Sequence, residues 1–274
     1  MKKEFLIMHS YALSPRKIAL VLVAASIVLA IAGISVEFSR HYLGEFPLKW
    51  RIFRLFYMGG EGNIPSWFAT SLLLISSLLL MAISYVKKLE KDKLTRHWQG
   101  MAIIFVILSI DEAVMLHEQL HLVTRYLPPI THGYGWIVPA MFGVTIFVLA
   151  YIPFLKRLPR DTSILIFLAG AIFILGAVGM EIAALPWQEE GVDSDMVSGT
   201  LIVIEEFLEK IGIVLFIYAL TSYVAKHMKV TAFVFGEEVP YQESAQLLAV
   251  EQPAFSLERG EKCASEGKEA IIQD

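Results

Sequence analysis

Cysteine is almost absent from this chain of 274 residues, and charged residues are scarce. Cys263 is the single cysteine, so no disulfide can form within the chain and a disulfide-stabilised secreted fold is excluded. Charged residues make up 18% of the sequence, whereas soluble domains have about 25%. The 27 acids outnumber the 23 lysines and arginines, which argues against a nucleic-acid partner. A phosphate-binding loop is missing as well, so no nucleotide cofactor is expected.

Apolar residues make up 56% of the sequence, and they gather in six long runs. A helix needs roughly 20 apolar residues to cross a bilayer core of about 30 Å. Each run should be helical, because lipid offers no hydrogen-bond partner to an unpaired backbone group. The runs cover residues 18–36, 67–86, 101–122, 136–155, 163–185 and 200–224. We therefore predict an all-α polytopic membrane protein with six transmembrane helices.

The distribution of lysine and arginine predicts how these helices are oriented. Fourteen of these residues fall in the N-terminal arm, the second and fourth loops and the stretch after the last run, and five fall in the other loops. Cytoplasmic segments carry the excess of positive charge. Both termini should therefore be cytoplasmic, in a plasma or inner membrane. The first run is also compatible with a cleaved signal peptide, but its length favours an uncleaved span.

Three parts of the chain differ in composition. Residues 1–17 are expected to form a cytoplasmic arm, and residues 18–229 the six-helix transmembrane domain. Within it, residues 48–58 mix apolar side chains with Lys49, Arg51 and Arg54, which is typical of a helix on the membrane surface or, equally, of a connecting loop. Residues 230–274 are expected to form a mostly disordered acidic cytoplasmic tail, because nine acids and three basic residues follow from Glu237 onward.

Acidic residues and histidines stand within or beside the predicted spans, although a charge at the centre of a transmembrane helix costs about 2.5–3.5 kcal/mol. They are Glu61 before the second span, Asp111, Glu112, His117, Glu118 and His121 in the third, Glu181 in the fifth, and Glu205, Glu206 and Glu209 in the sixth. In the predicted orientation most of them lie toward the outer leaflet, and a continuous third helix would place Asp111 and Glu118 on one face. We therefore predict that four segments bring these groups into one polar site.

The spacing of these residues suits metal ligands. Glu118 and His121 form an E-x-x-H step, and Glu206 and Glu209 form an E-x-x-E step, so each pair lies on one side of a helical turn. The arrangement resembles that of carboxylate-bridged di-iron and di-manganese bundles, which take a Glu from each of two helices and an E-x-x-H step from each of two others. The resemblance concerns the ligands and not the fold. It implies metal ligands at Glu61, Glu118, His121, Glu181, Glu206 and Glu209.

Other polar residues would surround these ligands, orient them and relay protons. They are Asp111, Glu112, His117 and Glu205. Because Glu209 stands where those bundles have a second histidine, iron, manganese and zinc all stay open as the metal. Iron would favour oxidation of a lipid-phase substrate such as a quinone or an acyl chain, and zinc would favour hydrolysis by a metal-activated water.

Three sequence motifs carry a second resemblance. They are EGNIPSW at residues 61–67, DEA at 111–113 followed by HE at 117–118, and GME at 179–181. With these motifs the chain resembles an uncharacterised group of bacterial multi-pass membrane proteins without an established activity. The resemblance covers most of the membrane part and implies a membrane location, but it implies no chemistry.

The buried acids fit two further classes of function, so whether the protein is an enzyme stays open. A proton- or cation-coupled transporter or channel would use them as a carboxylate network. A scaffold subunit of a membrane complex would use them as hydrogen-bonding contacts between helices. Six spans without an evident repeat are few for a monomeric carrier, which argues against transport unless a homodimer or a larger membrane complex supplies further spans. The partners expected are the lipid bilayer and a lipid-phase small molecule or a cation.

Overall fold

A computed structural model describes residues 14–116, 137–180, 182–184 and 196–228 of the chain. The chain divides into two units, Met1–Thr231 and Ala232–Asp274, and every described residue belongs to the first. The predicted tail at 230–274 and most of the predicted arm at 1–17 lie outside the described residues. All regular structure in the described ranges is helical, which confirms the all-α prediction for this part of the chain.

The described residues form a series of helices along the chain. They are α1 (Pro15–Tyr42), α2 (Lys49–Phe56), α3 (Ile64–Leu89), α4 (Thr95–Val114), α6 (Ile137–Leu155), α7 (Arg160–Ile174) and α9 (Met196–His227), and α7 continues into a π-helical turn, η2 (Leu175–Met180). The eight residues of α2 confirm a helix within the stretch 48–58. Pro65 stands in the first turn of α3, where its missing N–H leaves no helical hydrogen bond unmade.

Four of the helical segments are long and apolar enough to cross a membrane: Pro15–Tyr42, Ile64–Leu89, Thr95–Val114 and Arg160–Ala184. They correspond to the first, second, third and fifth predicted spans. Large apolar side chains such as Leu20, Phe142 and Phe167 are more than 60% exposed on the outside of the bundle, as lipid contact requires. The chain is therefore a membrane protein. The fourth and sixth predicted spans are the helices α6, with 19 residues, and α9, with 32 residues.

The third predicted span differs from the observed helix in its position. The helix α4 begins at Thr95 and ends at Val114, where Met115 adopts a left-handed conformation with φ 55° and its N–H bonds to the carbonyl oxygen of Asp111 at 2.8 Å. A left-handed residue of this kind ends a helix. The prediction that Asp111 and Glu118 share one face of a continuous helix is therefore wrong, because α4 ends between them.

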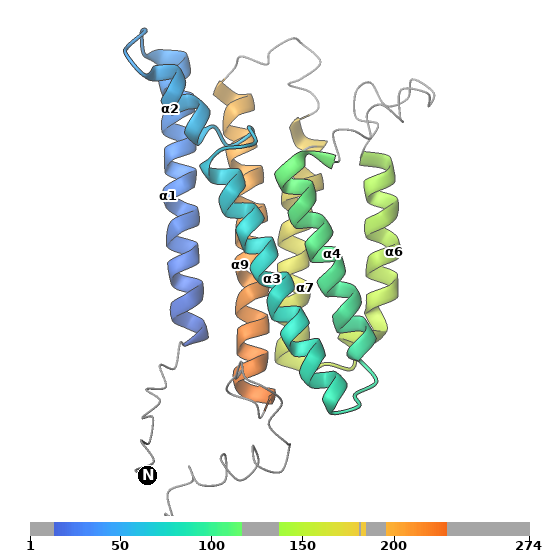
Figure 1. The fold of residues 1–274 in the computed structure, drawn as a ribbon. Coiled ribbons are helices and arrows are strands. Elements are labelled where there is room, and N and C mark those ends of the chain that lie inside the picture. The colour runs from blue at the N-terminus through green and yellow to red at the C-terminus, as the bar shows by residue number, and fades with distance from the viewer. Residues whose placement is uncertain (1–13, 117–136, 181, 185–195, 229–274) are drawn as a thin grey trace, which may run out of the picture. The chain divides into compact units, whose positions relative to one another are not determined.

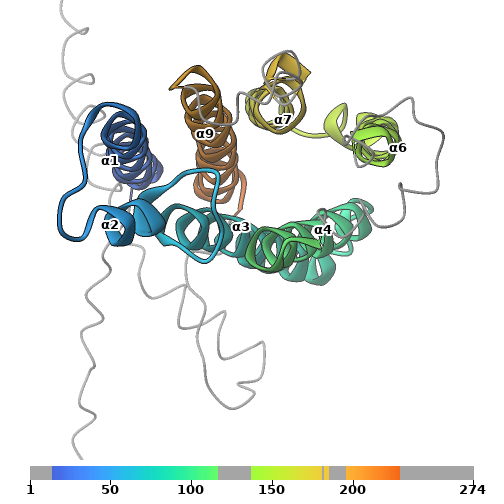
Figure 2. The ribbon, with the colours of Figure 1, turned by 90° about the horizontal axis from the view of Figure 1, so that it is seen from above.

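The helix α9 is the central element of the bundle. It packs against α1, α3 and α7, and α3 pairs along its length with α4. Figure 2 shows α1, α9, α7 and α6 in one layer and α2, α3 and α4 in a second layer. Serine hydroxyls join α3 to α4, since Ser77 donates to the carbonyl oxygen of Ala102 at 2.9 Å and Ser109 to that of Thr70 at 3.0 Å.

Apolar packing is concentrated toward one end of the bundle. There the rings of Trp98 and Phe154, both without exposed surface, meet edge to face at 4.9 Å, and the ring of Tyr223 of α9 lies tilted against Trp98 at 5.2 Å. A second apolar cluster joins α1, α3 and α9 around Leu72, Ile213 and Ile217. The other half of α9, at the end of the bundle where α2 lies (Figure 1), carries Glu205, Glu206, Glu209 and Lys210.

Candidate functional site

A buried lysine is the centre of the candidate site. Lys210 of α9 has no exposed surface, and its ammonium donates to a carboxylate oxygen of Glu206 and, at 3.4 Å, to the carbonyl oxygen of the same residue. The two residues lie one turn apart on one side of the helix. Glu206 keeps 22% of its side chain exposed. The pairing satisfies a charge whose burial would otherwise be strongly unfavourable.

Carboxylates from two helices lie within electrostatic reach of Glu209, the residue that directly precedes Lys210. The charges of Glu206, Lys210, Glu112 and Glu205 all act on the carboxyl group of Glu209, and Glu112 belongs to α4 whereas the others belong to α9. We call these five residues, Glu112, Glu205, Glu206, Glu209 and Lys210, the charged site. Full ionisation would put four negative charges against one positive charge. Such an excess in a low-dielectric interior needs bound protons or cations to offset it.

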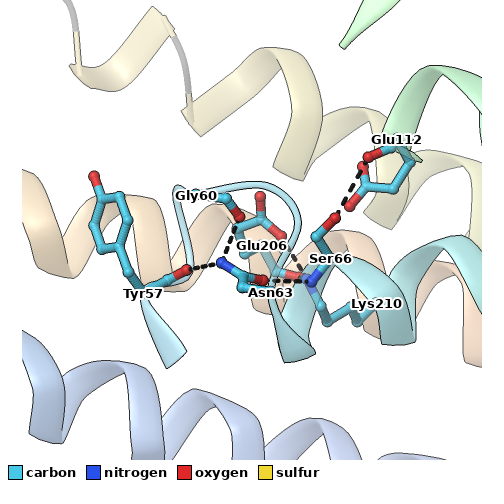
Figure 3. Close-up of polar contacts among 7 residues, drawn as sticks. All are labelled: Tyr57, Gly60, Asn63, Ser66, Glu112, Glu206 and Lys210. Atoms are coloured by element: carbon cyan, nitrogen blue, oxygen red, sulfur yellow. Dashed lines mark hydrogen bonds and ion pairs between the residues drawn. The ribbon is translucent and has the colours of Figure 1, made fainter. Parts of the chain in front are cut away.

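The start of α3 is fixed by Asn63, as Figure 3 shows. The side-chain oxygen of Asn63 accepts from the backbone N–H of Ser66 at 3.0 Å, and its amide donates to the carbonyl oxygens of Tyr57 and Gly60 at 2.7 and 2.6 Å. Asn63 thus caps the helix and closes the preceding loop at the same time. Within that loop Gly62 has φ 66°, a conformation that glycine adopts without strain.

This loop and the start of α3 join the two helices of the charged site. Ser66 donates to the carbonyl oxygen of Glu112 at 3.4 Å, which connects α3 to α4 (Figure 3). A methyl group on Gly59 would stand 2.9 Å from the side chain of Ile202, so the loop also lies directly against α9. Glu61, a predicted ligand, is in the same loop, and one of its carboxylate oxygens is buried.

The π-helical turn η2 packs on the other side of the charged site. A methyl group on Gly176 would lie 3.0 Å from the carbonyl oxygen of Glu205 and from Cγ and the backbone nitrogen of Glu209. A side chain there would be tighter than most Cβ contacts, so glycine favours this approach of the two backbones. Turns of this type occur often at functional sites. This turn was not predicted from the sequence, because a π-bulge has no simple hydrophobic pattern.

A further buried carboxylate, Glu37 of α1, was not predicted from the sequence because it directly follows the first apolar run. Its side chain is only 2% exposed, and among the described residues no hydrogen-bond donor reaches either carboxylate oxygen. The nearest nitrogens of basic side chains are Nη1 of Arg40 at 3.9 Å and Nδ1 of His41 at 3.7 Å. A methyl group on Gly199 would lie 2.5 Å from one oxygen, so Glu37 rests directly on α9.

Glu37 and the buried ion pair lie along the same side of α9. Gly199, Glu206 and Lys210 are separated by seven and four residues, close to whole numbers of helical turns. At a rise of about 1.5 Å per residue, Gly199 is about 10 Å closer to the start of the helix than Glu206. Carboxylates of α1 and α9 therefore follow one another along this face.

The predicted ligands are described only in part. The structure brings together Glu206 and Glu209, along with Glu112 and Glu205, and it places Asp111 in the last turn of α4. The predicted residues His117, Glu118, His121 and Glu181 lie outside the described residues. Among the residues that are described, no three His, Cys, Asp or Glu side chains are grouped as a metal site requires. The metal centre therefore stays a prediction.

Comparison with known proteins gives a family for the chain. None of the curated proteins and none of the solved structures matches the sequence significantly. The model of one protein family matches residues 16–224, a range that extends from the first turn of α1 nearly to the end of α9. The chain therefore belongs to that family, a domain of unknown function designated DUF8692.

Proposed function

We propose that this protein is a six-span membrane protein whose charged site takes up cations, protons in the first place, from the outer face, as in a proton- or cation-coupled transporter or channel. The observation that carries the proposal is the fully buried ammonium of Lys210, which is paired with Glu206 and directly follows Glu209, a carboxylate on which the charges of Glu112 and Glu205 also act. Ionisable groups inside a membrane are costly, and they commonly mark ion pathways and proton relays.

The distribution of basic residues supports the orientation that this function needs. Lys17 stands in the first turn of α1, Lys87 and Lys88 in the last turn of α3, and Lys226 in the last turn of α9. These three helix ends lie together at the end of the bundle opposite α2 (Figure 1). Under the positive-inside rule that end is cytoplasmic. The charged site, in the half of α9 toward the other end, would then open to the outer leaflet.

The arrangement of Lys210 provides a way to exchange partners. The ammonium is bonded to Glu206, and Glu209 directly precedes Lys210 in the chain, with the charge of Lys210 acting on its carboxyl group. A proton or cation that binds Glu206 neutralises the lysine's partner, which leaves the ammonium attracted to Glu209. Binding at one carboxylate thus changes the charge balance at the next, which is what a relay of ions requires.

Flux through reconstituted protein tests this proposal. The full chain is placed in liposomes that contain a pH-sensitive dye, and a membrane potential is imposed. We expect proton flux that Glu209→Gln reduces at least tenfold. Glu45→Gln is the matched control, because Glu45 lies in the connection before α2 with 69% of its side chain exposed. Wild-type liposomes as tight as protein-free liposomes would refute the proposal.

A metal centre is the second candidate, and one observation favours it. The predicted ligand Glu181 immediately follows the turn η2, which is packed against Glu205 and Glu209. The expected metals are iron, manganese or zinc, and the substrate would come from the lipid phase. Metal analysis of the purified chain distinguishes the two functions. Near-stoichiometric metal in wild type and in Glu45→Gln, but not in Glu209→Gln, would favour the metal centre. A wild-type protein that holds no metal and gives no flux would favour a scaffold subunit.

A further inference from the structure

A cavity of about 410 Å³ lies between α1 and α2. Its volume falls within the range of roughly 300–1,000 Å³ typical of small-molecule sites. Apolar side chains dominate its lining, among them Val36, Leu43, Phe46, Ile52, Phe53 and Phe56. The polar groups in the lining are few, and two of them, Arg40 and Lys49, are cationic. The cavity therefore combines an apolar interior with positive charge.

The connection between α1 and α2 holds this cavity in shape. The ammonium of Lys49 donates to the carbonyl oxygen of Leu43 at 2.8 Å and lies 3.5 Å from a carboxylate oxygen of Glu45. Leu48 precedes α2 with φ 72°, a conformation that a residue with a side chain rarely adopts. A strained residue at such a turn is often found where the chain clamps a ligand. The connection is thus built by specific contacts and is not a loose loop.

Further cations on α2 add to the positive charge of Arg40 and Lys49 at the cavity. The guanidinium of Arg40 lies 5.5 Å from the centre of the Phe53 ring, and 32% of its side chain is exposed. The helix α2 adds Arg51 and Arg54 to Lys49 and contains no acid. This surface would attract a negatively charged molecule. Trp50, which is 59% exposed, is a residue type typical of the membrane–water interface.

We propose that this cavity binds one anionic phospholipid of the outer leaflet, with an acyl chain inside the cavity and the phosphate beside Arg40. The neighbouring surface of α1 is apolar and exposed at Ile31 and Phe38, as expected of a helix in contact with lipid chains. A single molecule with an apolar chain and a negative head satisfies both parts of the cavity. The proposal depends on the orientation given above and is independent of what the charged site transports or binds.

Native mass spectrometry of the full chain tests the binding of lipid. The detergent-solubilised protein is mixed with phosphatidylglycerol or with phosphatidylcholine of the same acyl chains. We expect one tightly retained phosphatidylglycerol, and at least fivefold weaker retention of phosphatidylcholine. Arg40→Gln should weaken retention of phosphatidylglycerol about fivefold, the effect of one cation near an anionic lipid. Equal retention of the two lipids would overturn the proposal.

Two matched controls separate a site from a diffuse positive surface. Arg51→Gln removes a cation from α2 that does not line the cavity, so retention should change less than twofold. Ala32→Phe fills the cavity and should abolish retention, whereas Ile31→Phe, at a neighbouring residue with 60% exposure outside the cavity, should leave it intact. Equal effects of Arg40→Gln and Arg51→Gln, or full retention in Ala32→Phe, would refute a defined site.

Discussion

Removing the buried ammonium should destabilise the protein more than removing both partners of its ion pair. Lys210→Met keeps an unbranched side chain of similar length at a position without exposed surface, but it removes the one positive charge of the charged site and leaves Glu206 without its partner. Glu206→Gln is the complementary change, because it leaves the ammonium buried without its charged partner. The double variant removes both charges and leaves two neutral side chains.

The exposure of the two partners sets the expected size of these effects. Loss of one partner from a buried ion pair costs about 3–5 kcal/mol, whereas replacement of both is often neutral. Glu206 is 22% exposed and can take up a proton, so Lys210→Met should fall near the lower limit, about 3 kcal/mol. Glu206→Gln should cost as much or more, because Lys210 has no access to solvent. The double variant should recover at least half of the loss.

The free energy of unfolding can be followed in mixed micelles by the fluorescence of the five tryptophans as the fraction of denaturing detergent rises. The double-mutant cycle then gives a coupling energy, which we expect to exceed 1.5 kcal/mol. If the double variant lost as much stability as the two single variants together, the ion pair would be refuted as the centre of the site. Wild-type stability in Lys210→Met would refute the burial of the charge itself.

Two further substitutions test how the helices are positioned. Gly199→Ala should destabilise the protein by about 1–3 kcal/mol, because the new methyl group would lie 2.5 Å from the carboxylate of Glu37. Gly170→Ala is the control, because its methyl group has open space. That variant should be at least as stable as wild type in the same assay. Asn63→Ala should cost about 1–2 kcal/mol through loss of the α3 cap, whereas Ser71→Ala, which removes an exposed bond within α3, should change stability by less than 0.5 kcal/mol. Thermal unfolding that ranks either control below its partner would contradict the packing described.

The helices were predictable because their apolar runs have the length that a bilayer imposes, and the acids were predictable as a group because charges are rare in such runs. The sequence did not reveal where α4 ends, since the left-handed residue there is Met115, a residue type that seldom marks a helix end. Glu37 was not predicted either, because α1 continues six residues beyond the predicted span at 18–36. These features depend on contacts between helices, which no local pattern contains.

Both the apolar core and the charged site depend on α9, and this explains how a group of carboxylates can be held inside the bundle. One half of the helix is fixed by Ile213, Ile217 and Leu220, which pack against three neighbouring helices. Gly212 and Gly176 bring the backbone of the α7–η2 segment close to α9 on one side, and Gly199 brings Glu37 close on the other. The apolar half therefore positions the charged half, whose mutual repulsion would otherwise separate the helices. In the proposed function, a proton or cation that binds a carboxylate of the charged site would change which carboxylate pairs with Lys210, while the apolar half of α9 keeps the helices in place.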